Sequence, residues 1–255
     1  MAAAALLGGL TLALPAQAGA AGPVCDAPLD MLRLANPLSR VSQKLSSGDP
    51  ITIVAIGSSS TAGAGASSPA ANYPSRLQIE LSAQFPKHVF KVINRGVNGE
   101  EVDDMLKRFD TVVAEKPDLV LWQLGTNSVI RDHSVTGHDL AIHDGVRRLK
   151  EFGADVILID PQFAPKVIVK PEAEAMVKLI AQTAKVENVD LFRRYAVMRH
   201  WHDDDHMTFE SFVSPDGLHM NDWSYACIAK GLGNVIAEAA TRPVAAASVV
   251  SPVYP

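Results

Sequence analysis

Short runs rich in β-branched residues alternate along this chain with longer segments whose apolar residues recur at helical spacing. The first run, Ile51–Ile56, ends at Gly57, as a buried strand does before a turn. The pattern predicts further strands at 89–93, 119–122, 156–159 and 189–192, and helices at 73–85, 101–109, 137–152, 171–184 and 221–240. Because strands separated by helices form a mainly parallel sheet with helices on both faces, we expect one α/β domain, a three-layer α/β/α sandwich around a five-stranded sheet.

The charge of the chain excludes one class of partner. Its 255 residues carry a formal charge of −5, and basic residues occur in isolated pairs such as Arg147-Arg148. No basic tract is long enough to follow a phosphate backbone, so we expect no nucleic acid as partner. After the first residues, no run of about 18 apolar residues predicts a membrane-spanning helix, and we expect no stable membrane insertion. Nothing in the sequence implies a cofactor or indicates an oligomeric state.

The N-terminal residues differ from the rest of the chain. Residues 2–14 are small and apolar, and Pro15 and the triplet Ala16-Gln17-Ala18 follow, which is typical of a signal-peptide cleavage site. The positively charged leading part of such a signal is missing, and an alanine-rich terminus or one turn of core helix is the alternative. We therefore predict a secretory signal at 1–21, a lead-in at 22–50, the main domain at 51–241 and a flexible tail at 242–255, in an exported protein that is periplasmic or secreted.

Two cysteines, Cys25 and Cys227, are present. Export permits a disulfide between them, which would tie the N-terminal segment to the last helix. Two free thiols are the alternative, because the sequence does not reveal how far apart the residues lie.

Two segments far apart in the sequence carry the parts of an activated hydroxyl nucleophile. Gly57-Ser58-Ser59-Ser60 follows the first strand, and Asp216 and His219 lie about 160 residues further on. A serine hydroxyl becomes a good nucleophile when a histidine takes its proton and an acid orients the histidine. The carboxyl ends of parallel strands meet at one edge of a sheet, so the fold can bring the two segments together. We therefore predict a serine hydrolase.

Two further loops follow predicted strands and could supply hydrogen-bond donors. One is Asn94–Gly99 and the other is Gly125-Thr126-Asn127. Each has a simpler interpretation, since Gly99 could be a turn glycine and Asn127 a helix cap. His219 taken alone could be a packed or capping histidine. A phosphate-binding loop at 57–65 is disfavoured because no lysine follows it and the G-x-G-x-x-G pattern is not matched.

Taken in order, these four segments resemble those of the SGNH hydrolase superfamily, the GDSL lipases and esterases, over about 51–240. The resemblance implies a flavodoxin-like sheet, Ser59 as nucleophile, His219 as general base and Asp216 as the residue that orients it. It also implies an oxyanion hole made by the Ser59 N–H, the Gly99 N–H and the Asn127 amide. Ser58 replaces the aspartate of the usual Gly-Asp-Ser, and Ser58 and Ser60 are the alternative nucleophiles.

A cluster of histidines and aspartates at 200–206 could suggest a metal site. Its charged residues are consecutive, so on a helix they would point in all directions, and we predict a solvated loop or helix end and no metal. The cluster precedes the predicted base, which makes Trp201 and Phe212 candidate substrate contacts at the rim of the site.

The predicted reaction is ester hydrolysis through an acyl-enzyme. Small residues after the nucleophile, Ala62–Ala66, do not suggest a long acyl channel. We therefore favour release of a small acyl group, acetate, from an envelope or extracellular saccharide or a small ester. The alternatives are a lysophospholipase or thioesterase, a saccharide O-acyltransferase, and a polysaccharide-binding protein without catalytic activity.

Overall fold

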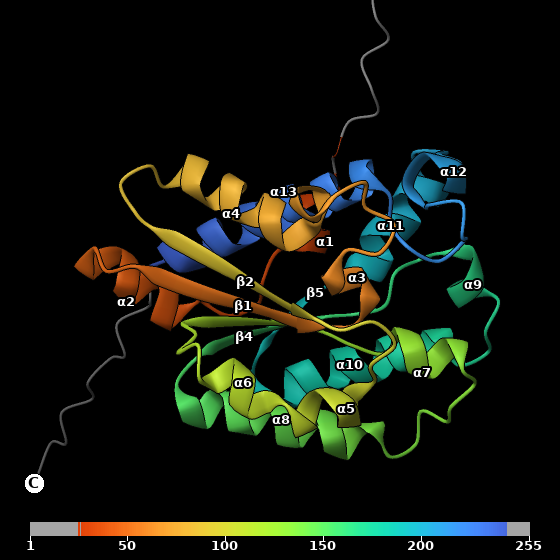
Figure 1. The fold of residues 1–255 in the computed structure, drawn as a ribbon, viewed down its shortest axis with the longest axis horizontal. Helices are drawn as coiled ribbons and strands as arrows, with labels where there is room; N and C mark the ends of the chain where they lie inside the picture. Colours follow the sequence, from red (N-terminus) through yellow and green to blue (C-terminus); the bar gives the residue numbers. More distant parts are fainter. Residues whose placement is uncertain (1–24, 26, 244–255) are drawn as a thin grey trace, which may run out of the picture.

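The computed structural model describes residues 25 and 27–243, which fold around one parallel β-sheet (Figure 1). The strands are β1 Ile51–Gly57, β2 Phe90–Gly96, β3 Leu119–Gln123, β4 Asp155–Ile159 and β5 Asp190–Phe192. They lie in the order β2-β1-β3-β4-β5, and every neighbouring pair is parallel. This is the flavodoxin-like order, so the predicted fold class is confirmed.

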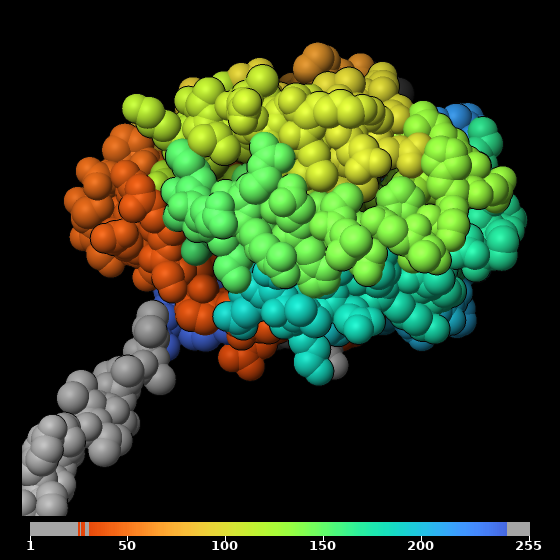
Figure 2. Space-filling view, turned by 90° about the horizontal axis from the view of Figure 1, so that it is seen from below, coloured from red at the N-terminus to blue at the C-terminus, as the bar shows by residue number. Residues whose placement is uncertain are grey.

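Helices cover both faces of the sheet. The longer helices are α2 Ser39–Ser47, α4 Tyr73–Gln84, α8 His138–Phe152, α10 Ala173–Glu187, α11 Arg194–Asp203 and α13 Asp222–Thr241. The shorter ones are α1 Leu29–Leu32, α3 Ser59–Ala62, a 3₁₀ turn at Pro69–Ala71, α5 Val102–Lys107, α6 Phe109–Val113, α7 Thr126–Ile130, α9 Pro165–Ile168 and α12 Phe209–Phe212. Helices α4 and α13 lie on one face, and α5, α6, α8 and α10 on the other (Figure 1). In Figure 2, α8 runs between the yellow-green segment of α5 and α6 and the blue-green α10.

The sheet is buried on both faces, which explains the nearly continuous apolar runs of its strands. All five residues of β3 are buried, as are six of the seven residues of β1. Helix α4 begins where Asn72 Oδ1 accepts a hydrogen bond from Ser75 N at 2.9 Å, and it ends before Pro86. The core thus fixes a rigid platform whose carboxyl edge carries the loops after β1, β2 and β3.

The predicted lead-in at 22–50 is part of the domain over its described residues. Leu38 and Val41 are buried, and the Val41 N–H donates to Asp155 Oδ2 at 3.0 Å, at the amino end of the sheet. Arg40 pairs with Asp118 at 3.0 Å. Leu32 and Leu34 are buried in the same core, although the segment lacks the regular apolar spacing of the longer helices. The predicted signal at 1–21 lies outside the described residues, as do residues 244–255 of the predicted tail.

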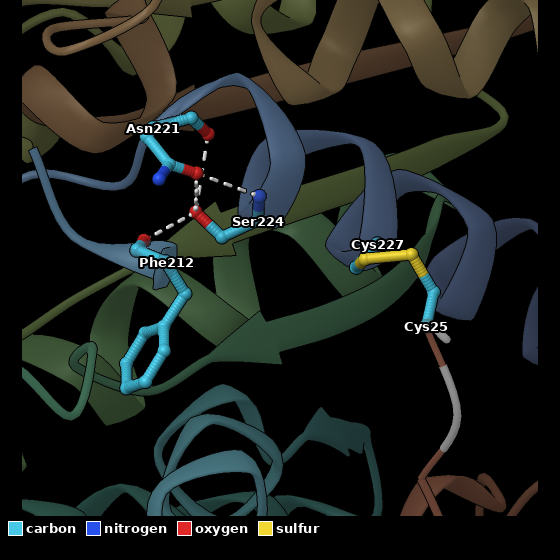
Figure 3. The surroundings of a disulfide bond; sticks show 5 residues. All are labelled: Cys25, Phe212, Asn221, Ser224 and Cys227. Atoms are coloured by element: carbon cyan, nitrogen blue, oxygen red, sulfur yellow. Dashed lines mark hydrogen bonds between the residues drawn. A yellow bond between two sulfur atoms is a disulfide. The ribbon is translucent and has the colours of Figure 1, made fainter. Parts of the chain in front are cut away.

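Cys25 and Cys227 form a disulfide, with their Cα atoms 5.1 Å apart (Figure 3). The bridge joins the N-terminal segment to α13, so the alternative of two free thiols does not hold. Of the helices within residues 25 and 27–243, none has the length and apolar character needed to cross a membrane.

Candidate active site

Ser59 is the first residue of α3, on the turn that follows β1. The turn is tightly packed, because a Cβ atom on Gly57 would lie 2.3 Å from Thr61 Oγ1. Glycine is therefore required at this position. Ser58 and Ser60 are 1% and 0% exposed, whereas Ser59 is half-buried. Of the three serines, Ser59 is the one that a substrate can reach.

His219 lies between Ser59 and Asp216. Its Nε2 is 2.8 Å from Ser59 Oγ, and its Nδ1 is 2.5 Å from Asp216 Oδ2. Asp216 Oδ1 also accepts hydrogen bonds from Ser214 Oγ at 2.7 Å and from the N–H groups of Leu218 and His219 at 2.9 Å each. Burial raises the pKa of Asp216, but these hydrogen bonds outweigh it and hold the pKa below its usual range.

An ionised Asp216 decides which nitrogen of His219 carries the proton. A carboxylate can only accept hydrogen bonds, so the Nδ1 atom that faces it must donate. Nε2 then presents its lone pair to the Ser59 hydroxyl. The arrangement can take a proton from Ser59 and stabilise the resulting imidazolium.

The loop that carries Asp216 and His219 is held at both ends. Val213 and Met220 form an antiparallel bridge, and the Ser214 N–H donates to the His219 carbonyl at 2.7 Å. Beyond it, Asn221 Oδ1 accepts from Ser224 N at 3.1 Å and caps α13. Ser224 Oγ donates to the Phe212 carbonyl at 2.6 Å, which joins α13 to the end of α12 (Figure 3).

The loop after β2 brings Gly99 next to Asn127. Gly99 has φ +81°, and the Asn127 amide donates to the carbonyl of the adjacent Glu100 at 2.8 Å. The Val97 N–H donates to the Gly57 carbonyl at 3.0 Å and so attaches this loop to the turn of Ser59. Within the described part of the chain, the N–H groups of Ser59 and Gly99 donate no hydrogen bond. Both remain available to a developing oxyanion.

An ionic network missed by the sequence analysis holds the Gly99 loop against α7. Arg131 donates to the Gly99 carbonyl at 2.8 Å and to Glu101 at 2.6 Å. Glu101 also accepts from Ser128 Oγ at 2.8 Å and contacts His133 Nδ1 at 3.0 Å. Burial raises the pKa of Glu101, but these contacts outweigh it and lower the pKa overall. Helix α7 therefore supplies Asn127, and Arg131, which follows the helix, fixes the neighbouring glycine.

The prediction that Trp201 and Phe212 contact substrate is wrong. They are 1% and 0% exposed, and their rings pack against each other with centroids 5.8 Å apart. The segment around Trp201 is helix α11, which turns this face into the core. Phe209, a half-buried aromatic residue nearby, lines with Pro165 a hollow of about 340 Å³ beside the Asp216 loop.

The histidine and aspartate cluster at 200–206 spans the end of α11. His200 Nδ1 lies 2.7 Å from Asp204, and His202 Nδ1 lies 2.8 Å from Asp203. These are pairwise contacts between neighbouring residues. In the part of the chain that the structure covers, no three such side chains converge as metal ligands would.

The strand order and the placement of these side chains are those of SGNH hydrolases, and this is the class to which the protein belongs. More narrowly, residues 24–242 match the non-GDSL lipase-like family, and the chain belongs to that family. The family's name agrees with the sequence around Ser59, where Ser58 stands in place of the aspartate of Gly-Asp-Ser. Among curated proteins, no sequence matches the chain.

Several solved structures share this fold at low sequence identity. A two-domain esterase active on acetylated mannans, crystallised with mannopentaose, has a TM-score of 0.70 and 20% identity over 82% of this chain and 56% of its own. The chain thus spans little more than half of that protein. TesA has a TM-score of 0.62 and 20% identity over 74% of this chain and 99% of its own. A catalytic mutant of an acetylxylan esterase from Geobacillus stearothermophilus has a TM-score of 0.63 and 19% identity over 74% and 95%.

Proposed function

We propose that the protein hydrolyses carboxylic esters through an acyl-enzyme on Ser59. The observation that carries this proposal is the hydrogen-bonded series from Ser59 Oγ through His219 to Asp216, with 2.8 Å between Ser59 Oγ and His219 Nε2. Ser59 Oγ attacks the ester carbonyl while its proton passes to Nε2. The N–H groups of Ser59 and Gly99 and the Asn127 amide stabilise the oxyanion. The intermediate collapses, and the alcohol leaves with the proton from Nε2.

Deacylation uses the same groups with water as the nucleophile. Nε2 of His219 takes a proton from water, and the hydroxide attacks the acyl carbonyl carbon. The second intermediate breaks its bond to Ser59 Oγ, which recovers the proton from Nε2. The products are the carboxylic acid and the regenerated enzyme.

We propose acetate as the acyl group and an acetylated saccharide as its carrier. Two structures with the same fold are esterases whose names refer to acetylated mannans and acetylxylan. The packing around the segment after Ser59 supports a small acyl group, because neighbouring residues of the protein occupy the space beside Gly63 and Gly65. A Cβ atom on Gly63 would lie 2.8 Å from Asn72, and one on Gly65 would lie 2.4 Å from the Met220 carbonyl. The hollow lined by Phe209 would receive part of the saccharide.

We also propose that the protein is exported. The apolar segment with its Ala16-Gln17-Ala18 site supports this, as does the Cys25–Cys227 disulfide, since such bonds persist in oxidising compartments. Cell fractionation and the N-terminal sequence of the recovered protein test it. A protein found in the cytoplasm with Met1 intact would contradict it.

Hydrolysis of p-nitrophenyl esters from acetate to palmitate, run beside Ser59→Ala, tests the reaction and the acyl length together. We expect activity on acetate and propionate that the variant lacks. A preference for long chains would favour a lysophospholipase or thioesterase with the same nucleophile. A fluorophosphonate probe should label the wild-type protein and leave Ser59→Ala unlabelled, whereas a polysaccharide-binding protein without activity would remain unlabelled in both forms.

A further inference from the structure

Gln162 lies just beyond β4 and is completely buried. Its side chain sits beneath the active site, where the loops after β1, β3 and α12 come together. From its contacts we propose that Gln162 is a positioning residue, which sets where the nucleophile, the oxyanion amide and the base lie relative to one another. The inference rests on the proposed function, because these three roles are defined by it.

The contacts of Gln162 reach the immediate neighbours of three site residues. Its Oε1 accepts from Thr126 Oγ1 at 2.9 Å and from Ser60 Oγ at 3.3 Å. Its Nε2 donates to the Leu218 carbonyl at 3.1 Å. Ser60, Thr126 and Leu218 are each adjacent in sequence to one member of the site, namely Ser59, Asn127 and His219. One planar amide thus contacts all three loops.

A buried arginine fixes the orientation of this amide. Arg194 is 1% exposed, and its Nη2 donates to Gln162 Oε1 at 3.0 Å while its Nε donates to the Asp160 carbonyl at 3.0 Å. A guanidinium can only donate, so the amide atom that faces it must be the oxygen. Turning the amide over would set its NH₂ group against Arg194 and its oxygen against the Leu218 carbonyl. The Nε2 bond to Leu218 is therefore a consequence of the buried cation.

The geometry of the reaction explains why such a link matters. Ser59, Asn127 and His219 come from three separate segments, namely the start of α3, helix α7 and the loop before α13, and no strand or helix contains two of them. Acyl transfer requires the hydroxyl, the base and the oxyanion donors to be placed together, and an error of about 1 Å can cost ~10²-fold in rate. The Gln162 amide is hydrogen-bonded to a residue adjacent to each of the three, so it restricts how far they can move relative to one another.

Two variants separate the contacts. Gln162→Glu keeps the size of the side chain and the oxygen that accepts from Ser60, Thr126 and Arg194, but its carboxylate cannot donate to Leu218. Thr126→Val removes only the contact beside Asn127. For Gln162→Glu we expect kcat for p-nitrophenyl acetate to fall by ~10-fold or more, with KM within about threefold of wild type and fluorophosphonate labelling slowed in parallel. For Thr126→Val we expect a smaller fall of the same kind.

Val41→Ala is the control. Val41 is fully buried at the amino end of the sheet, so the variant should lose thermal stability while kcat stays at the wild-type value. If the wild type is active and the kcat of Gln162→Glu lies within twofold of the wild-type value, the inference is wrong. The proposed function would still stand. A wild type that neither hydrolyses esters nor reacts with the probe would overturn the proposed function, and the inference with it.

Discussion

The side-chain oxygen of Gln123 accepts hydrogen bonds from both the backbone N–H and the hydroxyl of Ser58, at 2.9 and 3.0 Å. Ser58 stands where the usual first segment of SGNH hydrolases has an aspartate. Gln123 is buried at the end of β3, and its oxygen also lies 3.4 Å from Thr61 Oγ1. The strand next to β1 thus supplies an acceptor that holds the turn of Ser59.

We expect Gln123→Leu to lower the free energy of unfolding by about 1–3 kcal/mol, because it leaves the Ser58 N–H and hydroxyl buried without an acceptor. Labelling of Ser59 by a fluorophosphonate should also slow. Urea denaturation and the labelling rate measure the two effects. Gln78→Leu is the matched control, since Gln78 is exposed and accepts from Val92 N at the far side of β2. Equal losses in the two variants would contradict a role for Gln123 in holding the turn.

Asn127→Ala should damage turnover far more than stability. Loss of one oxyanion donor costs ~10²–10³-fold in kcat, whereas loss of the hydrogen bond to the Glu100 carbonyl costs about 1 kcal/mol of folding free energy. Steady-state hydrolysis of p-nitrophenyl acetate and thermal melting separate the two. Asn36→Ala, at the opposite edge of the sheet beside Asp190, should leave kcat unchanged. Full activity in Asn127→Ala would remove this residue from the mechanism.

The buried carboxyl group of Asp160 should make stability depend on pH. Burial raises its pKa to about 7, and the Tyr195 N–H and the charge of Arg194 oppose this only in part. An unfolded aspartate has a pKa of about 3.9, so between about pH 4 and pH 7 the folded protein retains a proton that the unfolded chain has released. The free energy of unfolding should therefore fall as pH rises through this window, by at most about 1.4 kcal/mol per pH unit.

Asp160→Asn should abolish that part of the pH dependence, because an amide does not titrate and its oxygen can still accept from the Tyr195 N–H. The variant and the wild type should have similar stability near pH 5, and the variant should be the more stable protein near pH 7.5. Urea denaturation at the two pH values measures the difference. A difference that stays constant with pH would show that Asp160 is already ionised at pH 5.

Reduction of the Cys25–Cys227 bridge should lower the free energy of unfolding by about 2–4 kcal/mol, because it releases a constraint across 202 residues of the unfolded chain. Reduced wild type and the double variant Cys25→Ser, Cys227→Ser should have the same urea midpoint. Both should retain wild-type kcat, since the bridge takes no part in the hydrogen bonds of the site. An oxidised protein no more stable than the reduced one would contradict this expectation.

The sheet and the proximity of Ser59, His219 and Asp216 could be predicted from the sequence because each leaves a local pattern. Strands such as Ile51–Gly57 are continuous apolar runs, and the triad consists of residue types whose chemistry is distinctive at that spacing. Gln123 and Gln162 could not be predicted, because their partners come from strands and loops that are neighbours only in space. The prediction that Trp201 contacts substrate was wrong for a related reason. Its position in the sequence, shortly before Asp216 and His219, does not reveal which side of its helix faces the core.

Helix α2 was not predicted because the contacts that hold it against the sheet are made with residues far along the chain. Only Val41 is fully buried within it. The Arg40 side chain pairs with Asp118, and the backbone N–H of Val41 donates to Asp155. Such pairs carry no periodic signal. They become visible only once the amino ends of β3 and β4 are placed side by side.

The disulfide joins a residue near the start of the domain to its last helix, and the sequence has no third cysteine. As the chain is synthesised from its N-terminus, Cys25 has no partner within its own chain until Cys227 has been added. By then all five strands have been made. The bridge is therefore absent while the strands are being synthesised, and with two cysteines in the sequence only one intramolecular pairing is open to it. Once formed, the bridge holds the described N-terminal segment against α13 even when either of them unfolds locally, so the two ends of the domain cannot separate independently.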